Sequence, residues 1–368
     1  MLLELVRFLV VFLERHLDRV ERHENFPLND LLSLLFRFSF SLPTPELFVE
    51  MLAVWNVFVQ FVASGKCDGR RRPTYESGLL SLSGKLIERM LYSSCSTSLQ
   101  FLSNLSDTPA ITNQGRYGSA NSPQKMATTS NNTSSSFVSI NDNDSNTDDS
   151  STTLWTVPIS NKSELDEYIE KSIQLITTLA QIPGLVGQLL STVVPALQSS
   201  ATNYTTQGDI GARDLSTLCS IVSASSGYFV SSFNDTVRST FQIYSVILEV
   251  SFNILTQRTW SKGHTTLALL LQTFKTLGTF STFLGTCIKS QNNEISQNVG
   301  LLLERTAQLG ESILKGGRCE QCWSCCWSWF YSCISLFQDC LFCTFTVFLN
   351  QHPNKYNANC FKTCSSSL

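Results

Sequence analysis

Apolar residues recur at helical spacing along most of this chain, and this periodicity restricts its fold more than any other feature. The first stripe consists of Leu5, Phe8, Leu9, Phe12, Leu13, Leu17 and Val20, with the charged residues mostly off the stripe. From Ser163 onward, hardly any Gly/Asn hairpin signals or alternating strand patterns occur. The pattern predicts an all-α protein with no sheet of three or more strands.

Capping signals and breaks divide the stripes into separate helices. The clearest start is Thr44–Pro45–Glu46, with an N-cap residue, a proline at the first helical position and an acid in the first turn. The predicted helices run from the N-terminus through Val20, Phe26 to about Phe40, Pro45 to Ala63, Tyr75 to Leu102, Ser163 to before Pro183, Pro183 to Leu197, Asp209 to Phe233, Asp235 to Thr256, Ser261 to Ser290 and Asn293 to Leu314. Short connections favour antiparallel helix pairs, so we expect a degenerate HEAT-repeat-like α-solenoid.

Composition divides the chain into four regions. Residues 1–103 and 154–315 carry the helical stripes and are predicted to form HEAT-like helix pairs. Residues 104–153 are rich in Ser, Thr, Asn and Asp, with too little apolar surface to offset the entropy of ordering, so we predict a disordered insertion. Residues 316–368 form an atypical tail rich in cysteine and aromatic residues, which begins with an abrupt change at Gly316–Gly317.

The charged residues argue against nucleic-acid binding and against an enzyme. Their share is 15% and the net charge is -3, which leaves no basic stripe for a phosphate backbone. The triplet Arg70–Arg72 is short and follows a glycine in a predicted loop. No phosphate-binding loop or nucleophile elbow occurs, and the histidines are dispersed at His16, His23, His264 and His352. We expect a binding scaffold and assign no catalytic, cofactor or metal site.

Four of the 13 cysteines are scattered through the chain before the tail, at Cys67, Cys95, Cys219 and Cys287. Such isolated cysteines are typical of reduced, buried thiols in a cytosolic or nuclear protein. The first apolar stretch agrees with that location. Glu4 and Arg7 interrupt it, which makes it an amphipathic helix rather than a secretory signal.

The other nine cysteines lie in the tail, where three interpretations stay open. The pairs Cys319–Cys322 and Cys340–Cys343 have the spacing of a zinc module, although the residues between them are bulky and apolar. The segment Trp323–Leu349 is long enough to span a bilayer, at a cost for Gln338 and Asp339, and its cysteines are candidates for palmitoylation. The abrupt change in composition also suits an alternative or mistaken end of the coding sequence, without an evolved function. Membrane attachment is expected only through this tail.

Several stretches resemble the exportin-6 family of nuclear export receptors, which belongs to the importin-β superfamily. They are Phe26–Phe40, Pro43–Thr44 and Trp55–Phe58, then Glu167–Leu197, Arg213–Val250 with Phe233–Asn234–Asp235 at its centre, and His264–Leu284. These are core-packing patterns, and their order within Leu2–Leu314 carries the resemblance. The insertion and the tail after Leu314 depart from the family.

The resemblance implies a HEAT-repeat solenoid that carries actin with profilin out of the nucleus and binds this cargo together with Ran in its GTP form. It also implies a location in both nucleus and cytoplasm. Family members are far longer and the similar stretch is internal, so we expect the repeats that grip Ran to be missing and Ran-GTP to bind the chain weakly or not at all. The alternatives are a generic HEAT-repeat interaction scaffold and a protein attached to a membrane through its tail.

Overall fold

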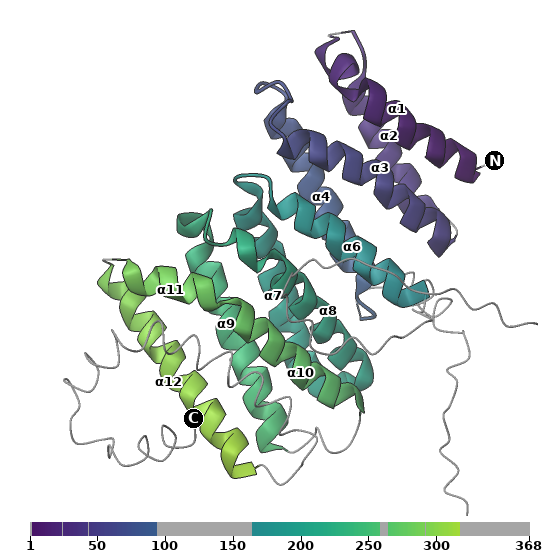
Figure 1. The fold of residues 1–368 in the computed structure, drawn as a ribbon. Helices are drawn as coiled ribbons and strands as arrows, with labels where there is room; N and C mark the ends of the chain where they lie inside the picture. The colour runs from purple at the N-terminus through teal and green to yellow at the C-terminus, as the bar shows by residue number, and fades with distance from the viewer. Residues whose placement is uncertain are drawn as a thin grey trace, which may run out of the picture.

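The computed structural model describes residues 2–23, 25–42, 44–93, 164–257, 264–290 and 292–316. Every regular element within these ranges is helical (Figure 1). The helices are α1 (Leu2–Arg22), α2 (Leu28–Ser41), α3 (Pro45–Ala63), α4 (Arg72–Met90), α6 (Glu164–Ala180), α7 (Leu185–Gln207), α8 (Asp209–Ser225), α9 (Phe233–Thr256), α10 (His264–Thr279), α11 (Ser281–Lys289) and α12 (Asn293–Gly316), with a 3-10 turn η1 at Ser226–Tyr228. The predicted all-α class is confirmed.

The helices stack in two layers that alternate along the sequence. In one layer α1, α3, α6, α8 and α10 lie side by side, each in contact with the next. In the other layer α4, α7, α9 and α12 follow one another in the same way, while α2 packs against α3. Figure 1 shows the array running from α1 at one end to α12 at the other. Consecutive helices form pairs, and the pairs stack into the predicted α-solenoid.

Helix α3 has the predicted bounds and buries the predicted stripe. Thr44 has the extended backbone of an N-cap residue, and Pro45 occupies the first turn, where a proline has no hydrogen bond to lose. All six stripe residues are buried: Phe48, Leu52, Trp55, Phe58, Val59 and Val62. Burying each such side chain contributes about 1.5–3 kcal/mol. The indole N–H of Trp55 donates to the Ser39 hydroxyl at 2.8 Å and so ties α3 to α2.

Buried hydroxyl pairs connect helices in the second half of the stack. The Ser251 hydroxyl of α9 donates to the Thr273 hydroxyl of α10 at 2.9 Å. The hydroxyls of Tyr244 on α9 and Thr306 on α12 lie 3.0 Å apart. A buried polar group without a partner costs about 1–3 kcal/mol, so these pairs favour one register of the neighbouring helices over others.

Aromatic contacts join the helices on either side of residues 94–163, an interval outside the described ranges. The rings of Phe48 on α3 and Tyr168 on α6 lie 5.6 Å apart. The guanidinium of Arg89 on α4 lies over the Phe48 ring, 4.3 Å from its centroid. Burial raises the pKa of Tyr168 well above its usual range, so its phenol stays protonated. The helices before and after this interval therefore pack directly against each other.

Two of the predicted helices are broken in the structure, and the prediction of continuous helices was wrong there. The helix predicted over Asp209–Phe233 ends at Ser225, and the helix predicted over Ser261–Ser290 is divided into α10 and α11. Phe229 and Phe280 lie at these breaks, both fully buried, with ring centroids 5.9 Å apart. The chain changes direction at each break, and these turns bring both rings into one part of the core. This is a tertiary effect that periodicity does not reveal.

The first predicted stripe is divided between two sides of α1. Leu13 and Leu17 are buried together with Val6, whereas Leu5 is 45% exposed and Phe8 is 61% exposed. Helix α1 lies at the end of the stack, with α3 as its neighbour in the layer. Among the described residues, the first half of α1 therefore carries apolar side chains both on its buried inner side and on its exposed outer side.

The predicted insertion at Asn104–Thr153 and the tail after Gly316 lie outside the described residues, as does Cys95. The zinc, lipid-attachment and membrane interpretations of the tail therefore stay predictions. The predicted boundaries of the four regions stay predictions for the same reason.

Two stretches in the described part, Pro45–Ala63 and Thr265–Lys289, are long and apolar enough to cross a membrane by length and composition. Half of each stretch is buried inside the fold, including Trp55 and Phe58 in the first. Core helices of helical stacks have the same property, so this finding is weak evidence for a membrane span.

Candidate interaction surface

The histidines and cysteines that lie within the described ranges are found in separate parts of the stack. His16 lies on α1 with its ring 5.5 Å from that of Phe12, and His264 begins α10. Cys67, Cys219 and Cys287 are buried free thiols, as predicted, and burial raises the pKa of the latter two to about 12. Within the described ranges, no three His, Cys, Asp or Glu side chains gather as metal ligands would.

The basic triplet Arg70–Arg72 lies at the turn between α3 and α4, where a loop was predicted. Its partners are Asp68 for Arg70 at 3.2 Å, the Glu21 carbonyl for Arg71 at 2.7 Å, and Glu76 for Arg72 at 2.7 Å. The buried carboxylate of Glu21 also accepts the backbone N–H of Asp68 at 2.9 Å. Arg71 and the bond between Asp68 and Glu21 therefore fasten this turn to the end of α1, while Arg70 and Arg72 pair with acids nearby in the sequence.

Asp214, which sequence reasoning missed, connects two distant parts of the chain. It is buried on α8, and its carboxylate accepts the backbone N–H groups of Tyr92 and Ser93 at 2.7 and 3.0 Å. Burial raises the pKa of Asp214, and the hydrogen bonds from Ser93 and Tyr92 partly offset that effect. The carboxylate holds the chain where it leaves α4. The signal in the sequence is an acid at an apolar position, next to the buried Leu215.

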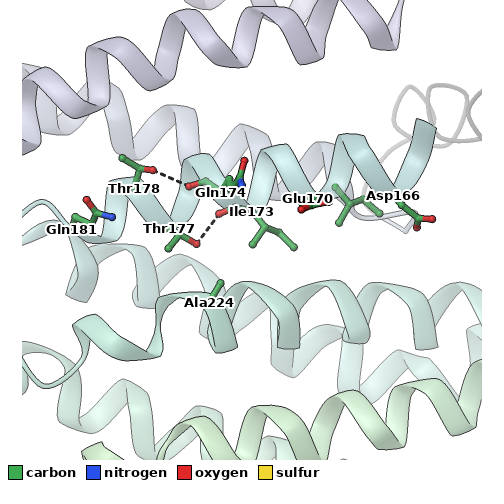
Figure 2. A pocket seen from close by; sticks show the side chains of 9 residues that line it. Asp166, Glu170, Ile173, Gln174, Thr177, Thr178, Gln181 and Ala224 are labelled. Carbon is green, nitrogen blue, oxygen red and sulfur yellow. Dashed lines mark hydrogen bonds between the residues drawn. The ribbon is translucent and has the colours of Figure 1, made fainter. Parts of the chain in front are cut away.

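A groove of about 580 Å³ runs along α6 where this helix faces α8 (Figure 2). Its lining consists of Asp166, Ile169, Glu170, Ile173, Gln174, Thr177 and Thr178 of α6, Gln181 just after α6, and Ala224 of α8. Figure 2 shows Ile173 pointing toward α8 and Ala224 pointing back toward α6. The hydroxyls of Thr177 and Thr178 donate to carbonyls of their own helix at 2.8 and 3.0 Å, so they lie against α6. One face of α6 thus forms a wall of the groove.

The two ends of the groove differ in chemistry. Asp166 and Glu170 lie toward the N-terminal end of α6, and Gln181 lies at the other end. Ile169 and Ile173 are half-buried along the helix between these ends. An apolar strip with acids at one end suits a partner segment that presents an apolar side chain and a basic side chain.

The fold and this surface define a class of protein. The chain is an α-solenoid, and stacked helix pairs of this kind present extended surfaces along which partners bind. The groove lies between two successive helices of one layer, so it is a surface that the stacking itself creates.

Comparison with known proteins finds partial similarity to exportin-6. Exportin-6 of Dictyostelium discoideum is 35% identical over 88 residues, which cover 23% of this chain and 8% of that protein. Human exportin-6 is 37% identical over 57 residues, or 16% of this chain and 5% of the relative. Exportin-6-A of Xenopus laevis is 31% identical over 101 residues, 26% and 9% of the two chains. The chain thus covers less than a tenth of each relative's length. No family model and no solved structure matches.

Proposed function

We propose that this chain is a binding scaffold of the nuclear export receptor type rather than an enzyme. The observation that carries the proposal is the similarity to exportin-6 within a chain that folds as an α-solenoid. Its partners under this proposal are actin with profilin as cargo and Ran in its GTP form, and it moves between nucleus and cytoplasm.

The mechanism under this proposal is binding along the stacked repeats. The groove between α6 and α8 receives a cargo segment, whose apolar side chain packs on Ile173 and whose basic side chain lies near Asp166 and Glu170. Ran-GTP and cargo raise each other's affinity, because coupling between two binding sites is reciprocal. Ran-GTP alone is expected to bind weakly.

The test is capture of actin–profilin by the immobilised full chain, with Ran-GTP or Ran-GDP added as the second variable. Ala224 is exposed and points into the groove, so Ala224→Trp fills the groove without disturbing the core. We expect this variant to weaken capture by about tenfold, the usual size of an effect at a central contact. The matched control is Ala307→Trp, which adds the same side chain to an exposed position on α12.

Two results would contradict the proposal in different ways. Capture no stronger than by an unrelated helical protein would remove the cargo assignment and favour a generic HEAT-repeat scaffold with another partner. Equal capture by the Ala224→Trp and Ala307→Trp variants would place the contact outside the groove.

A further inference from the structure

The chain leaves α4 through a short set of hydrogen bonds to α8. Helix α4 ends at Met90, and the next residue, Leu91, already has an extended backbone. The carboxylate of Asp214 accepts the backbone N–H of Tyr92 at 2.7 Å and that of Ser93 at 3.0 Å. The Ser93 side chain adds a further hydrogen bond to the same carboxylate. We call these bonds from Tyr92 and Ser93 to Asp214 the α4 exit clasp.

The hydroxyl of Ser93 is accessible in a way that many exposed hydroxyls of this fold are not. Many exposed serines and threonines on the helices donate to carbonyls of their own helix, as Ser33 does to Asn29 at 2.8 Å and Ser81 to Ser77 at 3.1 Å. A hydroxyl held in this way is difficult to place in line with a phosphoryl donor. Ser93 is exposed and lies in a turn outside the helices, so an enzyme can reach its hydroxyl.

We propose that Ser93 is a phosphorylation site and that a phosphate there opens the α4 exit clasp. A protein kinase transfers the γ-phosphoryl group of ATP to the Ser93 Oγ. The Oγ–H bond and the bond from the γ-phosphorus to the bridging oxygen break, and an Oγ–P bond forms. ADP is the leaving group, and the proton passes to the base of the kinase. The hydroxyl that donated to Asp214 is thereby replaced by a phosphate ester, which carries negative charge toward the same carboxylate.

Repulsion opens the clasp because the new charge lies beside a buried carboxylate. Asp214 is 1% exposed, so solvent screens its charge poorly. The phosphate carries a charge of about -1.5 to -2 at pH 7. The adjacent Arg213 is exposed, and its guanidinium lies 5.7 Å from the centroid of the Tyr92 ring. Because water and salt screen an exposed cation, Arg213 weakens the repulsion without cancelling it.

The opening is local. When the clasp breaks, the N–H groups of Tyr92 and Ser93 turn to solvent, and the chain is released where it leaves α4. The last turns of α4 stay in place, because Leu86, Ile87 and Met90 are buried in the core. Phosphorylation therefore frees the exit from α4 without unfolding the stack.

A first experiment asks whether the folded chain is modified at Ser93. The full chain is incubated with ATP and a eukaryotic cell extract, and its phosphorylated positions are mapped by mass spectrometry. We expect the phosphate at Ser93 to exceed that at Ser33 and at Ser81 by about tenfold or more, because the two helical hydroxyls are bonded to their own helix. Absence of phosphate from Ser93, whether or not other positions are modified, would overturn the proposal.

A second experiment measures the opening of the clasp. Phosphoserine is placed at position 93 of the full chain by codon suppression, and native-state amide hydrogen exchange at Tyr92 is followed. We expect exchange to become faster by about tenfold or more. The matched control is phosphoserine at position 231, since Ser231 is also exposed in a turn but donates to the Tyr228 carbonyl at 2.7 Å rather than to a carboxylate. This control should leave exchange at Tyr92 unchanged.

Two further variants test repulsion as the cause. Ser93→Ala removes the hydroxyl without adding charge and should speed exchange at Tyr92 by about threefold at most. In the Asp214→Asn background, phosphoserine at position 93 should have a similarly small effect, because the repulsion requires the carboxylate. Exchange that phosphoserine at position 93 leaves unchanged would contradict the proposal. So would an effect of Ser93→Ala as large as that of phosphoserine, or an equal effect of phosphoserine with and without Asp214→Asn.

Discussion

Substitution of Gly211 by Ala should separate two stacked helices. A Cβ at Gly211, in the first turns of α8, would lie 2.6 Å from the Tyr204 Cα of α7, about 0.8 Å closer than ordinary contact. The obstacle is backbone, which cannot rotate away, so we place the steric cost at about 2–3 kcal/mol, the upper part of the range for overpacking. The better helix propensity of Ala returns about 1 kcal/mol, which leaves a net loss of about 1–2 kcal/mol.

The same substitution at Gly300 provides the control, because it should have the opposite sign. Gly300 lies inside α12 with nothing within 4 Å of a built Cβ, so Gly300→Ala should stabilise the chain by about 0.5–1 kcal/mol. Urea unfolding of the full chain, followed by far-UV circular dichroism, measures both changes. If both variants shift the midpoint in the same direction, the close approach of α7 and α8 does not explain why position 211 requires a glycine.

Stability should also depend on the protonation of Asp214, because burial raises the pKa of this carboxyl group. The stabilisation from its protonated form is complete below the ordinary pKa of 3.8, and it is lost as the pH rises through the folded-state pKa. In urea titrations the wild type should therefore lose more stability than Asp214→Asn as the pH rises above about 4. Cys219 and Cys287 should react with iodoacetamide only as fast as the fold opens, because both thiols are buried. Site-resolved mass spectrometry can follow the two alkylation rates. Alkylation of the folded chain as fast as of the chain unfolded in urea would contradict their burial. Tyr244→Phe and Thr306→Val should each cost about 1 kcal/mol and the double variant little more, whereas additive losses in urea unfolding would show that the two hydroxyls act separately.

Much of the fold could be predicted because helix signals are local. Thr44 and Pro45 determine where α3 begins, and its apolar spacing identifies the buried face. The predicted start of α12 at Asn293 agrees with its capping, since the Asn292 side chain accepts the N–H of Glu294 at 2.9 Å. Such features depend on residues within one turn of each other, so periodicity and capping reveal them.

The remaining features depend on contacts between distant residues. The bond from Tyr92 to Asp214 spans 122 positions, and a single acid in a helical stripe does not reveal its partner. The breaks at Phe229 and Phe280 form because both rings enter one core, which no local signal announces. The groove has the same origin. Its acids on α6 are exposed, as charged residues on one face of an amphipathic helix usually are, but the approach of Ala224 from α8 requires the stack.

The interval 94–163 separates α4 from α6 in sequence, yet the two helices contact each other. Closing a long connection adds little entropy cost, about 0.6 kcal/mol for each doubling of its length. Two contacts lie across it: the Asp214 carboxylate holds the N–H of Tyr92, and Phe48 packs against Tyr168. Both depend on the neighbouring helices being in place, whatever the length of chain between them. A solenoid tolerates long connections because each helix is stabilised by the helices stacked beside it.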